Sequence, residues 1–419
     1  MKIAFAALLL CCTVWVHAAL VQVMVSPNQK NWEAKNLGET TTFTVSIYRY
    51  GNLVEDASIS YEIGPELFPE KKGELVLKKG QTTLKAALKE PGFLRCKVTA
   101  RVDGQSYTGM ATVAYGKEQL KPFSQDPADF DAFWKGAMDE ARKIPLDTRM
   151  TLIPERCTAT LNAYHVSYQN ERYGSRMYGI LMVPKKEGKY PALLLVPGAG
   201  IRPYGGAAYG DDVITLQVGI HGIPVNMPQQ VYDDLNAGAL RDYPFFNLND
   251  RNRYYYKRVY TGCTKGIDLI YSLPQFDGKT VGVTGGSQGG ALSIITTALD
   301  SRIRFLAAFY PALCDQTAYA HKRAPGWPMQ YLARPLTEAE SATTGYYDVS
   351  NFARRVQVPM FLGFGYNDDV CSPSSVQATL NIIPSAEKDV HVFQDTGHWT
   401  YPEENNAAWK WLQKKLHAK

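Results

Sequence analysis

The sequence predicts an α/β protein with a mainly parallel sheet and helices on both faces, preceded by a separate all-β domain. From about residue 157 onward, continuously apolar runs alternate with helical patterns, as expected for parallel strands that are buried on both faces. Before about residue 116, short strand patterns are separated by turn signals, and no helical pattern lies between them. Hydrophobic residues make up 45% of the chain and charged residues 20%, which is ordinary for a globular protein with a sizeable core.

The start of the chain has the pattern of a secretory signal peptide, which we expect over residues 1–18. Lys2 gives a positive start, an apolar run follows over 3–16, and the segment ending at Ala18 carries small residues suited to cleavage. The run is too short to span a bilayer, and Cys11 lacks the small preceding residue that lipidation needs. No later stretch is long and apolar enough for an integral membrane span, so we expect a secreted or periplasmic protein.

Residues 20–116 are expected to form an immunoglobulin-like β-sandwich. Apolar and polar residues alternate as in half-buried strands, and glycine-containing turns separate the runs. The alternating runs lie at 42–48, 75–77, 94–98 and 110–113, and the turns at 50–52, 79–81 and 103–105. Such a domain serves either to bind carbohydrate or to pack against its neighbour. The sequence shows no clear aromatic platform, which favours the packing role.

A polar linker with Pro122 and Pro127 is predicted over 117–127, and a second domain over 128–419. Its first helix opens at Asp129, which is placed to cap it. Strand and helix patterns then alternate, which predicts successive βα units. We expect strands at 176–183, 192–196, 281–283, 305–309, 360–363 and 390–393, and helices at 254–273, 290–300, 374–382 and 402–416.

Charge distribution and cysteine spacing give no sign of a nucleic-acid or metal-ion partner. The formal net charge is +5, and acidic and basic residues are interleaved, so no basic footprint for nucleic acid is visible. The cysteines that follow the signal peptide are scattered without C-x-x-C spacing, so no metal site is predicted. Their odd number leaves at least one thiol unpaired, and we interpret them as small buried hydrophobes.

The sharpest local signal is the segment Gly285-Gly286-Ser287-Gln288-Gly289-Gly290, which contains G-x-S-x-G. An apolar strand leads into it and a helical pattern leads out of it, which is the context of a nucleophile elbow in an α/β-hydrolase fold. Glycine-rich turns of this kind also bind phosphate, but neither G-x-G-x-x-G nor G-K-[ST] is present. Ser287 is therefore the predicted nucleophile.

A serine nucleophile needs a base and an acid, which follow it in the chain order Ser, Asp or Glu, His in this fold. His398 lies in a loop between the last strand and the last helix, and it is the predicted base. The acid should follow the preceding strand, where Asp368 and Asp369 both stand, and the residue pattern does not choose between them. The oxyanion hole should combine the N–H of Gln288 with one from the loop 197–200, assigned to Ala199.

Four segments resemble the acetyl xylan esterase and cephalosporin C deacetylase family, carbohydrate esterase family 7. They are the helix start 129–134, the tyrosine-rich 253–260, the G-x-S-Q-G-G of 285–290, and the acid loop 367–376. In that loop the family places its aspartate two residues before a hydrophobic residue and a cysteine, which selects Asp368. The resemblance implies hydrolysis of acetyl esters on sugars, with an acetylated oligosaccharide or polysaccharide as substrate and no cofactor.

Two positions depart from the family pattern. The R-G-Q motif expected after the strand near 213–218 is replaced by Ile220-His221-Gly222, and Ala199 stands where the family carries a tyrosine. The all-β domain is an addition to the usual family architecture. The resemblance implies a ring-shaped homo-oligomer, and the added domain is a departure from the chains that form such rings. The segment 315–351 is expected to form one wall of the acyl pocket. It contains the bulky residues Trp327, Tyr331, Tyr346 and Tyr347, and the alternative is that these aromatic side chains only pack the insertion.

Two other functional classes fit parts of the pattern. Another α/β-hydrolase, a feruloyl-type esterase or a peptidase, would use the same fold, although the large β-propeller of an oligopeptidase is absent. A glycan-binding protein with an inactive hydrolase domain is the second alternative. The complete set of Ser287, Asp368 and His398 argues against this second alternative.

Overall fold

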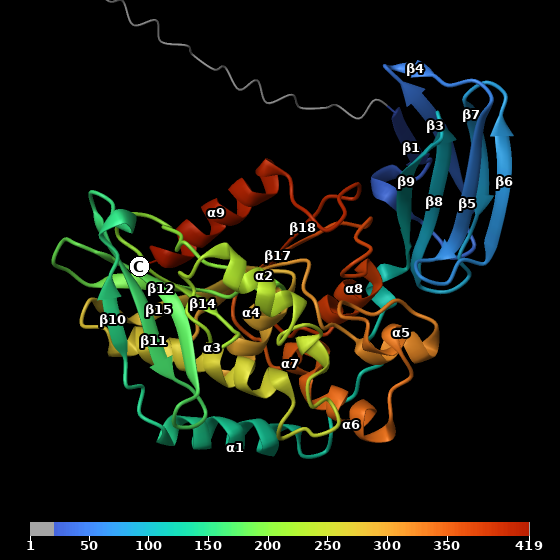
Figure 1. The fold of residues 1–419 in the computed structure, drawn as a ribbon. Coiled ribbons are helices and arrows are strands. Elements are labelled where there is room, and N and C mark those ends of the chain that lie inside the picture. Colours follow the sequence, from blue (N-terminus) through green and yellow to red (C-terminus); the bar gives the residue numbers. More distant parts are fainter. Residues whose placement is uncertain (1–20, 419) are drawn as a thin grey trace, which may run out of the picture.

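The first part of the chain folds as two β-sheets that share one hydrophobic core, in a computed structural model that describes residues 21–418 (Figure 1). The predicted signal peptide, residues 1–18, lies outside the described residues. Along the strand Thr41–Arg49, Phe43, Val45 and Ile47 are buried in the shared core, as the alternating pattern requires. The first sheet contains β1 (Val21–Pro27), β3 (Thr41–Arg49), β4 (Asn52–Leu53) and β7 (Gln81–Ala86). The second has the order β2 (Glu33–Ala34), β9 (Gln105–Tyr115), β8 (Gly92–Val102), β5 (Ala57–Pro65) and β6 (Lys71–Leu77).

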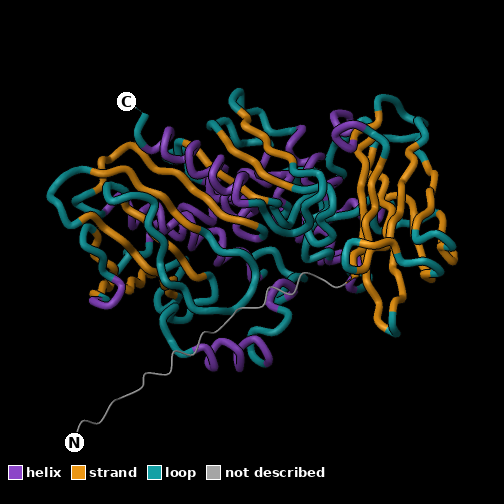
Figure 2. Tube along the Cα trace, turned by 90° about the horizontal axis from the view of Figure 1, so that it is seen from above, coloured by secondary structure: helices purple, strands orange, loops and turns teal. Residues whose placement is uncertain are grey.

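The rest of the chain is built on a nine-stranded sheet that is antiparallel at one edge and parallel elsewhere. The strand order begins with β10 (Arg149–Leu152), β11 (Leu161–Gln169), β12 (Arg176–Pro184) and β14 (Ile214–Gly219). It continues in parallel through β13 (Tyr190–Leu195), β15 (Phe276–Gly286), β16 (Phe305–Phe309), β17 (Met360–Phe364) and β18 (Lys388–Val392). The sheet twists strongly along its length (Figure 2).

Helices cover both faces of this sheet because its parallel strands are apolar on both sides. Leu194 and Leu216 belong to the large core cluster that includes α3 and α4, whereas Leu193 and Leu195 contact the cluster of α9. The helices are α1 (Phe130–Lys143), α2 (Gln229–Ala237), α3 (Tyr255–Ser272), α4 (Gln288–Leu299), α5 (Gln330–Ala333), α6 (Glu338–Tyr347), α7 (Val349–Ala353), α8 (Pro373–Asn381) and α9 (Pro402–Leu416).

The helix α1 is held by an aromatic cluster rather than by the expected cap. Trp134 is 2% exposed, packs against Tyr260 and Tyr347, and donates its indole N–H to the carbonyl of Tyr346 at 2.9 Å. Asp129 is the residue before the helix, but its side chain makes no capping hydrogen bond, so that prediction is wrong. Its carboxylate is instead engaged by Arg251 and the Tyr346 hydroxyl.

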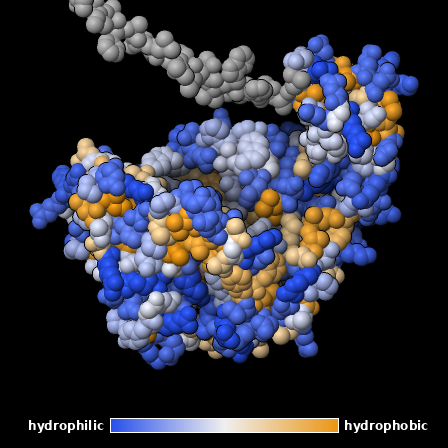
Figure 3. Space-filling model, in the orientation of Figure 1, coloured by the Kyte–Doolittle hydropathy of each residue, from blue (hydrophilic) through white to orange (hydrophobic). Residues whose placement is uncertain are grey.

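The β domain lies against one end of the α/β domain, beside α8 (Figures 1 and 2). The segment predicted as a linker, 117–127, is packed between them. Leu120 and Ser124 in it are buried, and the N–H groups of Phe123 and Ser124 donate to the carboxylate of Asp315. Hydrophilic residues dominate the β domain in the space-filling view, where hydrophobic residues form separate patches (Figure 3).

The five cysteines among the described residues are free thiols, and all except Cys157 are buried. Burial raises the pKa of the Cys96 and Cys263 thiols to about 12. Within residues 21–418, no helix has the length and apolarity needed to cross a bilayer.

The start of α9 carries a buried acid. Glu404 is 1% exposed, packs on Gly363 of β17, and neither carboxylate oxygen has a hydrogen-bond partner among the described residues. Burial raises the pKa of this carboxyl group from 4.5 to about 7. Because the folded chain then holds a proton that the unfolded chain has released, stability falls as the pH rises from about 4.5 to 7.

Replacing Glu404 with glutamine should remove this pH dependence. Glu404→Gln keeps the shape of the protonated acid, so its free energy of unfolding should match that of the native chain near pH 4.5. Above pH 7 the variant should be more stable, by on the order of 2–3 kcal/mol. Denaturant unfolding at the two pH values measures this difference. Glu403→Gln, at an exposed neighbouring position, is the control; an equal Glu404→Gln effect at both pH values would contradict the buried-acid interpretation.

Candidate active site

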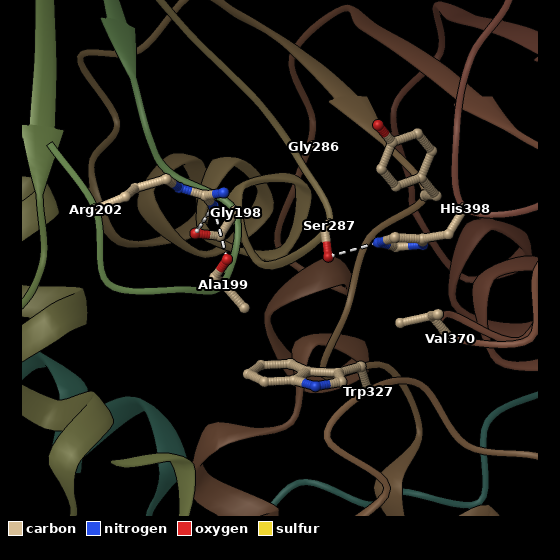
Figure 4. Close-up of a pocket in the computed structure, with 9 residues that line it drawn as sticks. Gly198, Ala199, Arg202, Gly286, Ser287, Trp327, Val370 and His398 are labelled. Carbon is tan, nitrogen blue, oxygen red and sulfur yellow. Dashed lines mark hydrogen bonds between the residues drawn. The ribbon is translucent and has the colours of Figure 1, made fainter. Parts of the chain in front are cut away.

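A cavity of about 370 Å³ opens at the carboxyl ends of the parallel strands, where open α/β sheets bind ligands. Ser287, His398 and Ala199, three of the predicted site residues, line it, and Figure 4 shows Ser287 facing the histidine ring. The full lining is Gly198, Ala199, Arg202, Gly286, Ser287, Tyr310, Trp327, Val370 and His398.

Ser287 stands on a strained turn between β15 and α4. Its φ is 59° and its ψ is −123°, a backbone conformation that residues with a side chain rarely adopt and that nucleophile elbows impose. The turn is tight because the backbone of Val196 approaches it closely. A Cβ atom at Gly285 or Gly289 would lie 2.5 or 2.4 Å from the Val196 carbonyl oxygen, so neither position accommodates a side chain.

Three predicted residues form one hydrogen-bonded line. His398 Nδ1 lies 2.8 Å from Asp368 Oδ2, and His398 Nε2 lies 2.9 Å from Ser287 Oγ. Since a carboxylate only accepts, the proton is on Nδ1, and Nε2 is free to accept the serine proton. The histidine ring packs against Tyr310, with ring centroids 4.6 Å apart.

The carboxylate of Asp368 is fully buried and completely engaged. Its Oδ1 accepts hydrogen bonds from the backbone N–H groups of Val370 and Cys371, both at 2.8 Å, while Oδ2 accepts from His398. Asp369 is exposed and lines a separate pocket with residues of the β domain. The geometry thus distinguishes two neighbouring aspartates that the residue pattern alone left equivalent.

The side chain of Gln288 links both sides of the expected oxyanion hole. Its Oε1 accepts from the hydroxyls of Tyr243 and Tyr256, both at 2.7 Å, and its Nε2 donates to the carbonyl of Pro197 at 3.3 Å. Burial raises the pKa of Tyr256, which keeps this hydroxyl protonated as a donor. Gln288 therefore fixes the first residue of α4 to the start of the loop 197–200.

The loop 197–200 is also held from its other side. Arg202 donates to the carbonyls of Gly198 and Ala199 at 3.1 and 2.6 Å (Figure 4). His221 Nε2 donates to the carbonyl of Gly200 at 3.2 Å, and its Nδ1 accepts from the Tyr255 hydroxyl at 2.7 Å. Burial lowers the pKa of His221 to about 4, so this ring is neutral.

Sequence reasoning does not identify these supporting residues. In the sequence, His221 is only a departure from the R-G-Q motif, and the tyrosines of 253–260 are only part of a helix that resembles the family's. The predicted wall is also narrower than expected: Trp327 lines the cavity, but Tyr346 and Tyr347 are buried in the aromatic cluster of α1. Tyr331 is not among the lining residues.

A serine on a strand–turn–helix, backed by a histidine and a carboxylate at the carboxyl edge of a parallel sheet, is the arrangement of an α/β-hydrolase. This chain is a serine carboxylic-ester hydrolase acting on acetyl esters. Residues 110–415 match the family described as acetyl xylan esterase (AXE1), and the chain belongs to that family. The resemblance found in the sequence motifs is confirmed.

Individual relatives agree with this assignment. The chain is 38% identical over 400 residues to the acetyl esterase Axe7A of Xylanibacter ruminicola, a match that covers 93% of this chain and 90% of the relative. Among solved structures, the acetyl xylan esterase from Paenibacillus sp. R4 matches with a TM-score of 0.61, and acetyl xylan esterase 1 from Thermoanaerobacterium sp. JW/SL YS485 with 0.62. Both are 25% identical, and each match covers 72% of this chain and 98% of the other.

Exchanging the two neighbouring aspartates for asparagine should separate their roles. Asp368→Asn places an amide against His398 and favours the wrong tautomer of the ring, so kcat for an acetyl ester should fall by about 10³-fold or more. Asp369→Asn, at an exposed position, should change kcat by less than about twofold. Steady-state kinetics on both purified variants measures this ranking, and the reverse ranking would show that Asp369 is the acid.

Proposed function

We propose that this chain removes acetyl groups from acetylated xylan or related oligosaccharides through an acyl-enzyme formed on Ser287. The observation that carries the proposal is the hydrogen-bonded line from Asp368 through His398 to Ser287, which ends in an open cavity. Membership of the acetyl xylan esterase family supports the substrate class. The name of the similar acetyl esterase Axe7A supports acetyl as the acyl group.

In the first half-reaction, Ser287 Oγ attacks the ester carbonyl carbon and His398 Nε2 takes the serine proton. The tetrahedral intermediate collapses, the C–O bond to the sugar breaks, and the imidazolium returns the proton to the departing sugar oxygen. In the second half-reaction, His398 takes a proton from water, whose oxygen attacks the acetyl carbon. The bond between that carbon and Ser287 Oγ then breaks, the imidazolium returns its proton to Ser287 Oγ, and acetic acid leaves and ionises to acetate. Asp368 keeps Nδ1 protonated and stabilises the imidazolium at both stages.

The backbone N–H groups of Gln288 and Ala199 are the proposed oxyanion hole. Within residues 21–418 neither N–H has a hydrogen-bond acceptor, which leaves both available to a developing oxyanion. Gln288 is also the first residue of α4, where the helix dipole favours negative charge. A main-chain donor does not depend on its side chain, so alanine serves at position 199 in place of the family tyrosine.

We propose that the acyl group lies beside Trp327 and Val370, which line the cavity near Ser287 (Figure 4). Both are apolar and suit a methyl group, while added methylenes must find space against their packed side chains. The polar sugar would lie toward Arg202, which lines the cavity and is exposed.

The remaining proposals concern the rest of the chain. We infer that residues 1–18 direct secretion or periplasmic export, and that 20–116 is an immunoglobulin-like domain followed by a catalytic domain over 128–419. Two facing sheets with a shared core support the second inference. The contacts of β8 with α8, and the hydrogen bonds of α8 with the segment 117–127 that follows this domain, support a packing role.

A panel of esters together with one nucleophile variant tests the proposed reaction. Ser287→Ala should fold normally and lose nearly all esterase activity, because only binding and the oxyanion hole would remain. For the native chain, kcat/KM should fall at least about tenfold from acetyl to butyryl esters. Acetylated xylo-oligosaccharides should release acetate.

Each arm has its own contrary result. Near-normal turnover by folded Ser287→Ala would exclude the serine mechanism. Faster turnover of butyryl or feruloyl esters than of acetyl esters would replace the acetyl esterase proposal by a different hydrolase specificity.

Activity should survive a strong chelator. The ligand atoms of Asp368, Cys371 and His398 lie within 4.8 Å of one another, but the Asp368 oxygens already accept three hydrogen bonds, as the triad requires. We therefore expect unchanged kcat after dialysis against EDTA. A loss that zinc or calcium restores would contradict a metal-free mechanism.

A further inference from the structure

The β domain reaches the loop that carries the catalytic acid through one buried arginine. Arg95 is on β8 and is 6% exposed. Its Nη2 donates to the backbone carbonyls of Tyr366 and Asp368, at 3.0 and 2.9 Å, and its Nε donates to Thr112 Oγ1 on β9 at 2.9 Å. One guanidinium thus holds the main chain at Asp368 and two residues before it, and its own orientation is set within the β domain.

A buried carboxylate of the β domain engages the same loop farther along. The side chain of Glu66 is 2% exposed and lies 4.0 Å from Arg95. It accepts hydrogen bonds from the backbone N–H and the hydroxyl of Ser374, in the first turn of α8. The loop 366–374 is therefore held near both ends by buried side chains of the neighbouring domain, a guanidinium at one end and a carboxyl group at the other.

Three further hydrogen bonds hold the start of this loop. Asn367 Nδ2 donates to the carbonyl of Met110 on β9 at 3.1 Å. The hydroxyl of Tyr366 donates to Glu33 Oε1 at 2.9 Å and accepts from Lys117 at 3.0 Å. Every residue from Tyr366 to Asp368 thus has a polar partner in the β domain or in the segment that follows it.

We propose that Arg95 is a positioning residue for Asp368, so that the active site is completed by the β domain. The carbonyl of Asp368 is bound by Arg95 on one side of the chain, while its carboxylate contacts His398 on the other. A charged donor holds carbonyl oxygens more tightly than a neutral one does. Because productive geometry is lost with displacements of about 1 Å, a loosened main chain at Asp368 would misalign His398. This inference rests on the proposed Ser–His–Asp mechanism.

A purely structural role at the domain interface is the competing explanation. It predicts that removing Arg95 lowers stability but leaves the turnover of the folded fraction unchanged. The positioning role predicts that kcat falls in protein that is still folded, with the hydrogen bond between Asp368 and His398 altered. The two explanations therefore differ in readouts other than stability.

The main test uses the full chain with Glu66→Gln and Arg95→Met combined. The double change removes both buried ionisable groups, so neither is left without its partner. Its kcat for an acetyl ester should fall roughly 10- to 100-fold while KM changes by less than about threefold. The low-field proton resonance that we expect for His398 Nδ1–H in the native chain should shift or broaden. Arg101→Ala, an exposed arginine on the same strand, is the control for both readouts.

Thr112→Val provides a second test without altering any charge. It removes the hydroxyl that orients the Arg95 guanidinium, and it should lower kcat severalfold with the same change in the proton resonance. This variant decides the question if the double variant does not fold. In Arg95→Ala, added guanidinium should restore part of the lost kcat by occupying the vacated space, and should not stimulate Arg101→Ala.

Native kcat and an unchanged proton resonance in the folded double variant, or in Thr112→Val if the double variant does not fold, would overturn this inference. Ser287→Ala separates that failure from failure of the mechanism itself. If Ser287→Ala is inactive while the β-domain variants behave as the native chain, only the role of Arg95 falls. If Ser287→Ala is active, the proposed mechanism falls first.

Discussion

The close approach of the Val196 carbonyl to the elbow is the constraint on which the site depends. It leaves no space for a Cβ atom at Gly285 or Gly289, so the residue after strand β13 and the turn into α4 meet through backbone alone. Ser287 lies at positive φ between these two glycines, and the loop after β13 lies beside the nucleophile. Gln288 then fastens that loop through Pro197. The nucleophile and both proposed oxyanion donors thus share one packing contact.

The sequence predicts the parts of this molecule whose signals are local. The bounds expected for β16 and α9 match the structure, because a continuous apolar run and a proline-initiated amphipathic helix are unambiguous. Strand β10 had no such signal, since all four of its residues are exposed. Asp129 looks like a cap but has stronger partners in Arg251 and Tyr346, which are distant in sequence.

The site residues also differ in how strongly the local sequence indicates them. Ser287 and His398 are recognisable from their flanking elements, and the structure brings them within hydrogen-bond distance. Asp368 and Asp369 are the same residue type at adjacent positions, so local sequence patterns do not separate them. The burial of Asp368 and its two backbone N–H donors distinguish it physically. Arg95 lies 271 residues before Tyr366, in a different domain, so no local pattern could connect it to the acid loop.

The free thiols have a consequence for the chemical reactivity of the protein. The five cysteines among residues 21–418 are free thiols, and all except Cys157 are buried. A buried thiol is a poor target for disulfide exchange, since the reactive thiolate is suppressed where burial raises the thiol pKa, as at Cys96 and Cys371.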